Sequence, residues 1–225
     1  MNKTDEAALE AFRRYGTSAV SDALDTLGSG GTGLPGVARV SGTAAVAGPA
    51  FTVRFTPVEP GEPGPAGEFV DEIPPGAVAL IVNDPTVACT IWGDLLATTA
   101  QRNGVAGTVI DGFCRDVGAI RALDYPLWSR GAYMKSGKQR VRQVAMQEPV
   151  EACGTLVTPG DIVVADDSGC LVVPAALVGK VADEVLRIEA MEQRIRADLA
   201  AGMELRVSRR RNGYNTTGLV APATA

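Results

Sequence analysis

The chain has 225 residues, of which 46% are hydrophobic and 5% aromatic, which is enough for one well-formed core in a single domain. Its formal net charge of −5 argues against broad nucleic-acid binding, and the absence of histidine excludes Ser-His-Asp and Cys-His catalysis and His-ligated zinc. Any acid–base or metal chemistry must therefore use carboxylates, Lys, Tyr, Arg or water, and oxygen ligands favour Mg²⁺, Mn²⁺ or Ca²⁺.

The cysteines predict a reducing environment. Cys89, Cys114, Cys153 and Cys170 show no CxxC spacing, and the N-terminus has no secretory pattern, so we expect a cytoplasmic protein with reduced thiols. No apolar run is long enough to span a membrane. Cys114 stands beside Arg115, so it is either a small buried residue or a nucleophile with a lowered pKa.

In chain order, two helices are predicted first, over residues 6–15 and 18–27, and Gly28 closes the second. A glycine-rich loop follows over residues 28–36. Strands are then expected over residues 45–55 and 77–82. The segment between them is rich in Pro, Gly and Glu, and it is either a mobile lid or an ordinary surface excursion.

The centre of the chain predicts a helix, a strand and a second helix. Asp94 is expected to be the N-cap of a helix over residues 95–102, which the pair Asn103-Gly104 ends. Residues 105–110 read as a buried strand that stops at Asp111-Gly112, and residues 117–123 form the next helix. The sequences Gly93-Asp94-Leu95-Leu96 and Arg115-Asp116 therefore lie on loops that flank one strand.

These two motifs contain residues suited to a small anion and a hard cation. The free backbone amides of Leu95 and Leu96, in the first turn of the helix, suit a carboxylate. Asp116 can ligate Mg²⁺ or Mn²⁺, and Arg115 offers a planar, charged fork to a carboxylate or enolate. Taken singly, Asp94 can be no more than an N-cap, and Arg115-Asp116 no more than a surface ion pair.

The second half adds strands near residues 139–146, 161–164 and 170–173, with a turn at residues 166–169 that is either a hairpin or a metal loop. The longest helix is predicted over residues 175–201. Its apolar stripe indicates burial in the core or against another subunit. The stripe comprises Val178, Val181, Val185, Ile188, Ile195 and Leu199.

Two charged features near the C-terminus allow two interpretations each. Glu192 lies outside the apolar stripe, where a glutamate is ordinarily solvated. The basic cluster at residues 206–211 is read as part of a C-terminal tail over residues 206–225, either solvated or in a subunit contact, with RNA contact as the alternative. The preceding residues, 1–205, are expected to form the domain.

The order of these motifs resembles the RraA-like family, which includes 4-hydroxy-4-methyl-2-oxoglutarate aldolases and the regulator of ribonuclease E activity A. The similarity extends over residues 12–205, including the segments at residues 18–24, 47–54 and 159–169. It implies an α/β fold of the swivelling β/β/α sandwich type with a mixed sheet. It also implies a homotrimer or a dimer of trimers, with sites between subunits.

The resemblance assigns roles to the motif residues. Asp116 would bind the metal directly, and Asp94 and Glu192 would hold metal-bound waters, with Glu192 supplied by a neighbouring subunit. Arg115 and the amides of Leu95 and Leu96 would hold the pyruvoyl part of the substrate. The implied cofactor is Mg²⁺ or Mn²⁺, and neither nucleic acid nor a membrane is an expected partner.

The implied activity is that of a class II, metal-dependent carbon–carbon lyase on a 2-keto acid, an aldolase or oxaloacetate decarboxylase that forms a metal-stabilised pyruvate enolate. No Schiff-base lysine is needed, and Lys135 and Lys138 lie far from the motif in the sequence. Aldolase members usually carry an acidic residue where this chain has Ala119. The alternative is a non-catalytic, protein-binding regulator of a ribonuclease.

Overall fold

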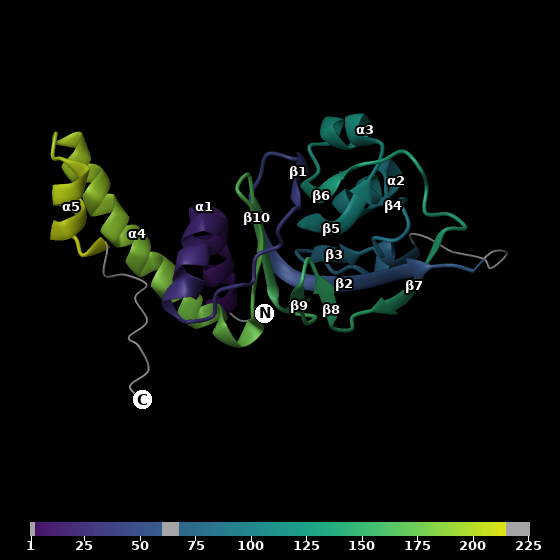
Figure 1. The fold of residues 1–225 in the computed structure, drawn as a ribbon, viewed down its shortest axis with the longest axis horizontal. Helices are drawn as coiled ribbons and strands as arrows, with labels where there is room; N and C mark the ends of the chain where they lie inside the picture. Colours follow the sequence, from purple (N-terminus) through teal and green to yellow (C-terminus); the bar gives the residue numbers. More distant parts are fainter. Residues whose placement is uncertain (1–2, 60–67, 215–225) are drawn as a thin grey trace.

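The computed structural model describes residues 3–59 and 68–214. A mixed sheet with strand order β1-β6-β5-β3-β2-β10-β11 forms its centre, with β4 added beside β5 and β7 beside β2 (Figure 1). The parallel part consists of β2 (Val46–Pro57), β3 (Val78–Val82), β4 (Thr90–Trp92), β5 (Gly107–Cys114) and β6 (Leu127–Ala132). The antiparallel additions are β1 (Ala38–Ser41), β7 (Val141–Met146), β10 (Ile162–Asp166) and β11 (Gly169–Val173).

The remaining elements cover this sheet. Helix α1 (Lys3–Thr26) packs on α4 (Val178–Ala200), and the two enclose a core with β10 and β11. The short elements η1 (Glu68–Glu72), α2 (Asp94–Arg102) and α3 (Val117–Ala122) lie beside the parallel strands, and the hairpin of β8 (Val150–Ala152) and β9 (Thr155–Val157) covers the other face of these strands. Element η2 (Ala175–Leu177) leads into α4, and α5 (Leu205–Arg211) follows it. The predicted α/β fold with a mixed sheet is confirmed.

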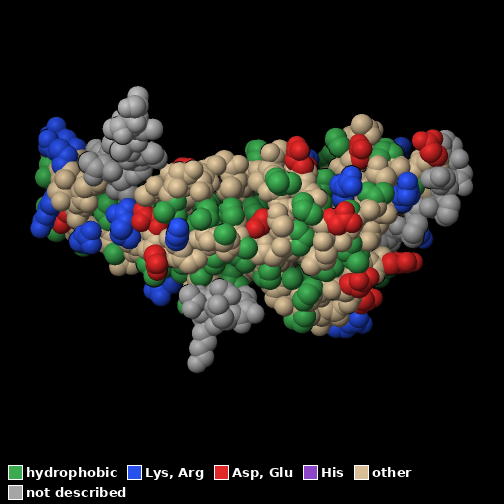
Figure 2. Space-filling view, turned by 90° about the horizontal axis from the view of Figure 1, so that it is seen from below, with side chains coloured by type: hydrophobic (Ala, Val, Ile, Leu, Met, Phe, Trp, Pro, Cys, Tyr) green, Lys and Arg blue, Asp and Glu red, His purple; other side chains and the backbone are tan. Residues whose placement is uncertain are grey.

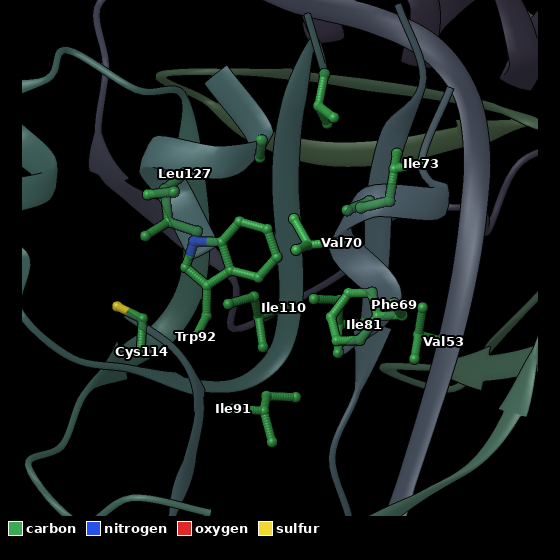
Figure 3. Close-up of a cluster of buried hydrophobic side chains, with 14 of the residues drawn as sticks. Val53, Phe69, Val70, Ile73, Ile81, Ile91, Trp92, Ile110, Cys114 and Leu127 are labelled. Atoms are coloured by element: carbon green, nitrogen blue, oxygen red, sulfur yellow. The ribbon is translucent and has the colours of Figure 1, made fainter. Parts of the chain in front are cut away.

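The core beneath α2 fixes the position of the first motif. Trp92 is 1% exposed, and its ring stacks on that of Tyr125 with centroids 6.2 Å apart. Phe69 of η1 lies near the same indole, and Ile110 of β5 borders it (Figure 3). Large rings buried in this way dominate the energetics of a core. The chain therefore leaves the core at a defined point, immediately before Gly93.

Several predicted elements are confirmed, and three details were wrong. Helix α2 begins at Asp94, so the N-cap position belongs to Gly93, which has no side chain to cap with. Strand β5 does not stop at Asp111-Gly112 but continues to Cys114. It can do so because its C-terminal end pairs with both β4 and β6, at the cost of a register irregularity between Ile110 and Phe113.

The third difference concerns the C-terminal part. The helix expected over residues 175–201 opens as η2, and only residues 178–200 are α-helical. Of the six residues in the apolar stripe predicted for this helix, Leu199 is 41% exposed and the other five are buried. Figure 1 shows α4 passing α1 and continuing beyond the sheet, with α5 at its far end.

The basic cluster lies largely on α5. Ser208 is fully buried, and its Oγ donates a hydrogen bond to Asp198 Oδ2 at 2.8 Å. Lys and Arg side chains gather at this end of the molecule (Figure 2). Residues 205–211 thus pack on α4, while residues 215–225 of the predicted tail lie outside the described residues, as do residues 60–67 of the predicted lid segment.

None of the helices in residues 3–59 and 68–214 combines the length and apolar character needed to cross a bilayer.

The turn at residues 166–169 is the predicted hairpin between β10 and β11. It is hydrogen-bonded to the N-terminal helix α1. Asp166 accepts hydrogen bonds from the backbone N–H and the hydroxyl of Thr17, both at 2.7 Å. Gly16 breaks α1 with a φ of 79°, and a Cβ at this position would lie 2.6 Å from Asp166 Oδ2. The two predicted helices are therefore joined at a kink that Asp166 caps.

The hydrogen bonds that Asp166 accepts predict that the protein loses stability at acidic pH. Burial tends to raise the pKa of Asp166, but the hydrogen bonds from Thr17 and Ser168 outweigh it, so the pKa is lower than usual. Because the folded state has the lower pKa, the stabilisation is present above the unfolded value of about 3.9 and is lost as the pH falls through the folded value. We expect Asp166→Ala to lower the free energy of unfolding at pH 7 by about 2 kcal/mol. Urea unfolding at pH 7 and pH 3 should show a smaller difference between variant and wild type at pH 3; an equal difference would contradict this role.

Candidate active site

The first motif opens onto a pocket of about 390 Å³ at the carboxyl ends of β4 and β5. Its wall is formed by β4, the first turn of α2 and a segment after β6. Asp94, Leu95, Leu96 and Arg115, all predicted from the sequence, line it. The structure thus brings together the two motifs, which lie on either side of β5 in the sequence.

Gly93 is the point at which the motifs meet. Arg115 Nε lies 3.2 Å from Asp116 Oδ2, and the backbone N–H of Arg115 donates to Trp92 O at 2.9 Å. A Cβ at Gly93 would stand 2.6 Å from Asp116 Oδ2 and 3.3 Å from Arg115 Nε. A side chain at this position would displace the ion pair from where it stands, so the start of α2 and the Arg115-Asp116 loop are packed closely against one another.

Asp116 itself adopts an unusual backbone conformation. It precedes α3 with a φ of 55°, in the left-handed region that non-glycine residues rarely occupy. Its side chain makes no capping hydrogen bond to α3. Its backbone carbonyl accepts the N–H of Ala119 at 3.0 Å, so the position at which aldolase members carry an acid lies on the first turn of α3. The carboxylate of Asp116 is consequently directed to Arg115 rather than to its own helix.

Asp94 interacts with the predicted anion-binding amides. The backbone N–H of Leu95 donates to Asp94 Oδ1 at 2.9 Å. This amide was predicted to be free, and in the structure it is occupied by the neighbouring carboxylate. Asp94 would have to turn away before the Leu95 N–H could donate to a substrate carboxylate. The Leu96 N–H also belongs to the first turn of α2, where amides have no hydrogen-bond partner within the helix.

Lys138 is a pocket residue that the sequence analysis left out. The segment after β6 lies along β4, because Thr90 N–H donates to Lys135 O at 2.8 Å and Gly137 N–H donates to Thr90 O at 2.7 Å. These bonds bring Lys138 to the same pocket as Arg115. A three-residue strand gives no sequence signal for such pairing, so nothing in the pattern could have found Lys138.

Cys114 does not act as a nucleophile at this site. Its side chain is fully buried, and its sulfur lies 3.4 Å from Ser129 Oγ. Burial raises the pKa of the Cys114 thiol, and this outweighs the opposing hydrogen bond from Ser129. A buried thiol with a raised pKa is inert. The interpretation of Cys114 as a small core residue is confirmed.

Glu192 does not join the site within one protomer. It lies on α4, which Figure 1 places on the opposite side of the sheet assembly from α2 and α3. Its carboxylate accepts a bond from Arg196 at 2.6 Å. The role predicted for Glu192 therefore requires a second copy of the chain.

The donor set at the site fits a hard divalent cation. Within the described ranges, no group of three or more His, Cys, Asp or Glu side chains gathers on one chain. Asp94 nevertheless lines the pocket, and the carboxylate of Asp116 lies close to Gly93, the residue before Asp94. Mg²⁺ is commonly held by one or two carboxylates, with waters completing its shell.

The fold is a mixed α/β sheet with helices, and its pocket at the start of α2 is lined by Asp94, Arg115 and Lys138. The chain belongs to the RraA-like family, because the family model described as Aldolase/RraA matches residues 17–172.

Two curated relatives illustrate the range of the family. Protein DlpA of Legionella pneumophila is 41% identical over 144 residues, covering 64% of this chain and 23% of that protein. A protein of Halalkalibacterium halodurans named "Putative 4-hydroxy-4-methyl-2-oxoglutarate aldolase" is 36% identical over 105 residues, covering 46% of this chain and 49% of that protein. The chain thus spans less than two thirds of the length of these relatives.

Solved structures match over more of the chain. An uncharacterized protein from Pseudomonas syringae has a TM-score of 0.83 and 38% identity, covering 91% of this chain and 97% of that one. Streptomyces coelicolor RraAS2, described as an unusual member of the RNase ES inhibitor RraA protein family, has a TM-score of 0.76 and 30% identity, covering 82% and 94%.

Proposed function

We propose that the protein is a divalent-cation-dependent carbon–carbon lyase that releases pyruvate from a 2-keto acid, as a 4-hydroxy-4-methyl-2-oxoglutarate-type aldolase, an oxaloacetate decarboxylase or both. The observation that carries the proposal is the meeting of Arg115 and the first turn of α2 in one pocket, with Asp116, which does not itself line the pocket, paired to Arg115 and close to Gly93. The name of the Halalkalibacterium relative supports the reaction class.

Each residue has a defined task in this proposal. Asp116 would hold the cation directly, and Asp94 would hold a water bound to it. The cation, when bound, would supply Lewis-acid stabilisation of the negative charge that develops on the keto oxygen. Arg115 adds a fixed positive charge beside that oxygen, which costs no reorganisation during the reaction.

The substrate carboxylate next to the keto group would be bound by the start of α2. The Leu96 N–H donates to this carboxylate first, and the Leu95 N–H donates to it as well once Asp94 turns away. A helix N-terminus favours such an anion through its unpaired N–H groups and its dipole. This arrangement orients the substrate without a Schiff-base lysine.

Lys138 completes the proposal as the binding partner of the second carboxylate of a dicarboxylic substrate, because it faces the same pocket as Arg115. We expect Lys138→Met to raise KM for oxaloacetate about tenfold, with a smaller change in kcat, since a lost charge contact of this kind costs about 1.4 kcal/mol. Steady-state kinetics measure the split. Lys135→Met, which alters a neighbouring lysine that does not line the pocket, is the matched control; an unchanged KM in Lys138→Met would remove this residue from the site.

The site is proposed to be completed by a neighbouring subunit in a homotrimer or a dimer of trimers. Leu95, which lines the pocket, is 77% exposed, and Met134, two residues before the pocket residue Ser136, is 73% exposed. Exposed apolar surface next to a polar site is typical of an interface. Glu192 of the neighbouring copy would then reach the cation-bound water, and light scattering after size exclusion would give the subunit number.

A second candidate is a protein-binding regulator that needs no catalysis. It is favoured by the similarity to Streptomyces RraAS2 and by Ala119, which lacks the acidic side chain usual in aldolase members. Co-purification of this protein with a ribonuclease, and inhibition that survives Asp116→Ala, would favour the regulator. Metal-dependent pyruvate release would favour the lyase.

A further inference from the structure

The carboxylate of Asp94 occupies a backbone amide at the start of α2. The Leu95 N–H donates to Asp94 Oδ1 at 2.9 Å, and such first-turn amides are the groups that bind small anions at a helix N-terminus. Of the described residues that line the pocket, Asp94 is the one with a carboxylate, and Arg115 and Lys138 are the two with a positive charge. Asp94 is therefore an internal anion in the pocket for which a substrate anion is proposed.

The contact between Asp94 and Leu95 is easily broken. It joins adjacent residues, so a rotation of the Asp94 side chain ends it without a shift of the backbone. In the described part of the chain, the Asp94 side chain makes no ion pair and no second hydrogen bond. Helix α2 itself stays anchored, because the N–H of the fully buried Ala97 donates to Gly93 O at 3.1 Å. The carboxylate can thus leave while the amide that it covers stays in place.

The carboxylate of Asp116 is held more firmly. It is paired with Arg115 at 3.2 Å, and it lies against Gly93, the residue before Asp94. The charge of a cation held by Asp116 would therefore act on Asp94 at short range. Of the two aspartates, Asp94 has only the bond to Leu95 to lose, so it is the one that is free to turn.

We propose that Asp94 makes the binding of the cation and of the keto acid cooperative. Without a cation, the Asp94 carboxylate stays on the Leu95 N–H and competes with the substrate carboxylate for it. With a cation at Asp116, Asp94 turns to a cation-bound water, and the Leu95 N–H becomes available to the substrate. The proposal rests on the site assigned under the proposed function, and it adds that Asp94 regulates this site. By linkage, the keto acid raises the affinity for the cation by the same factor.

This competition differs from direct contact between the keto acid and the cation. Such contact also makes the two bind cooperatively, but it has no effect on the protein without a cation. Competition by Asp94, in contrast, weakens carboxylate binding when no cation is present. The decisive comparison is therefore made in the cation-free protein.

The test is calorimetric titration of the full chain with pyruvate, in EDTA and at saturating Mg²⁺. In EDTA we expect Asp94→Ala to bind pyruvate about fivefold more tightly than the wild type, because the bond to Leu95 no longer has to be broken. At saturating Mg²⁺ the two should bind pyruvate with similar affinity. Asp71→Ala, which removes an exposed carboxylate at the other end of α2, is the matched control and should bind as the wild type does.

Asp94→Asn separates the hydrogen bond from the charge. Its amide oxygen can still accept the Leu95 N–H, so in EDTA it should bind pyruvate nearly as the wild type does. Two results would overturn the proposal. One is no gain of affinity in Asp94→Ala in EDTA, and the other is an equal gain in Asp94→Asn, which would assign the effect to charge alone.

These titrations require no turnover, so they separate this proposal from the lyase assignment. If the cooperativity is absent and the lyase assignment holds, Mg²⁺-dependent pyruvate release remains while Asp94→Ala and the wild type bind pyruvate equally in EDTA. If the lyase assignment fails, pyruvate release is absent while the fivefold gain in Asp94→Ala remains.

Discussion

Replacing Asp116 with alanine is expected to lower metal-dependent pyruvate release from oxaloacetate by at least about 100-fold. Loss of an outer-shell partner alone can cost 10- to 100-fold in metal affinity or activity, and Asp116 is proposed as a direct ligand. Initial rates of pyruvate formation at saturating Mg²⁺ measure the effect. Asp116→Asn, which keeps the size and backbone preference of the side chain but removes its charge, should fall nearly as far.

The matched control for this variant is Asp124→Ala. Asp124 is also an exposed aspartate with positive φ, 51° against 55° for Asp116, and its carboxylate accepts a hydrogen bond from the hydroxyl of Thr43. It therefore reproduces the backbone cost of placing alanine at such a position. Full activity in Asp124→Ala together with full activity in Asp116→Ala would end the assignment of Asp116 as a metal ligand.

Gly93→Ala is expected to reduce the same activity by about 100-fold without unfolding the protein. The added Cβ would lie 2.6 Å from Asp116 Oδ2, closer than carbon and oxygen can approach, so the Arg115–Asp116 pair must move. A displacement of about 1 Å at a catalytic group can cost 100-fold in rate. The rate of pyruvate release and the melting temperature should be measured together.

Gly118→Ala supplies the control for this substitution. Gly118 lies on α3, two residues after Asp116, and a Cβ there would meet no atom within 4 Å. We expect its activity to equal that of the wild type, with equal or slightly greater stability, because alanine favours a helix more than glycine does. If Gly93→Ala kept normal turnover, the close contact over Gly93 would have no part in the reaction.

The parts of the site with strong local signals were predictable from the sequence. Helix α2 ends at Arg102, before Asn103-Gly104, and the Arg115-Asp116 loop falls between β5 and α3 as expected. Each of these boundaries is set by residues within one or two turns of it, such as glycine with its freedom at positive φ. The same holds for the hairpin at residues 166–169.

What the sequence could not predict depends on pairing between distant segments. Strand β5 passes through Asp111-Gly112 because β4 and β6 provide hydrogen-bond partners on both sides, and β4 itself is only three residues long. Lys138 reaches the pocket through the bonds between Thr90 and the segment at residues 135–137. Sequence separation removes any periodic signal for such contacts, so β1, β4 and β6 were not anticipated. The hairpin of β8 and β9 is local, but its strands have only three residues each, which is too short for a clear alternation.

The prediction that Asp94 is the N-cap of α2 was wrong for a different reason. Asp94 has the residue type of an N-cap, but the contact of Gly93 with Asp116 and Arg115 places the helix start one residue earlier. A tertiary contact at the site thus overrides local helix preference, which is common where a chain serves function as well as folding.

The central claim is that this pocket performs metal-dependent cleavage of a 2-keto acid. The most direct test is pyruvate release by the wild-type protein from oxaloacetate and from 4-hydroxy-4-methyl-2-oxoglutarate, with Mg²⁺ and with EDTA, corrected for spontaneous decarboxylation. We predict release that requires Mg²⁺ and is faster from oxaloacetate, because Ala119 provides no acid–base group for the aldol substrate. No release from either substrate, or release that EDTA leaves unchanged, would contradict the claim.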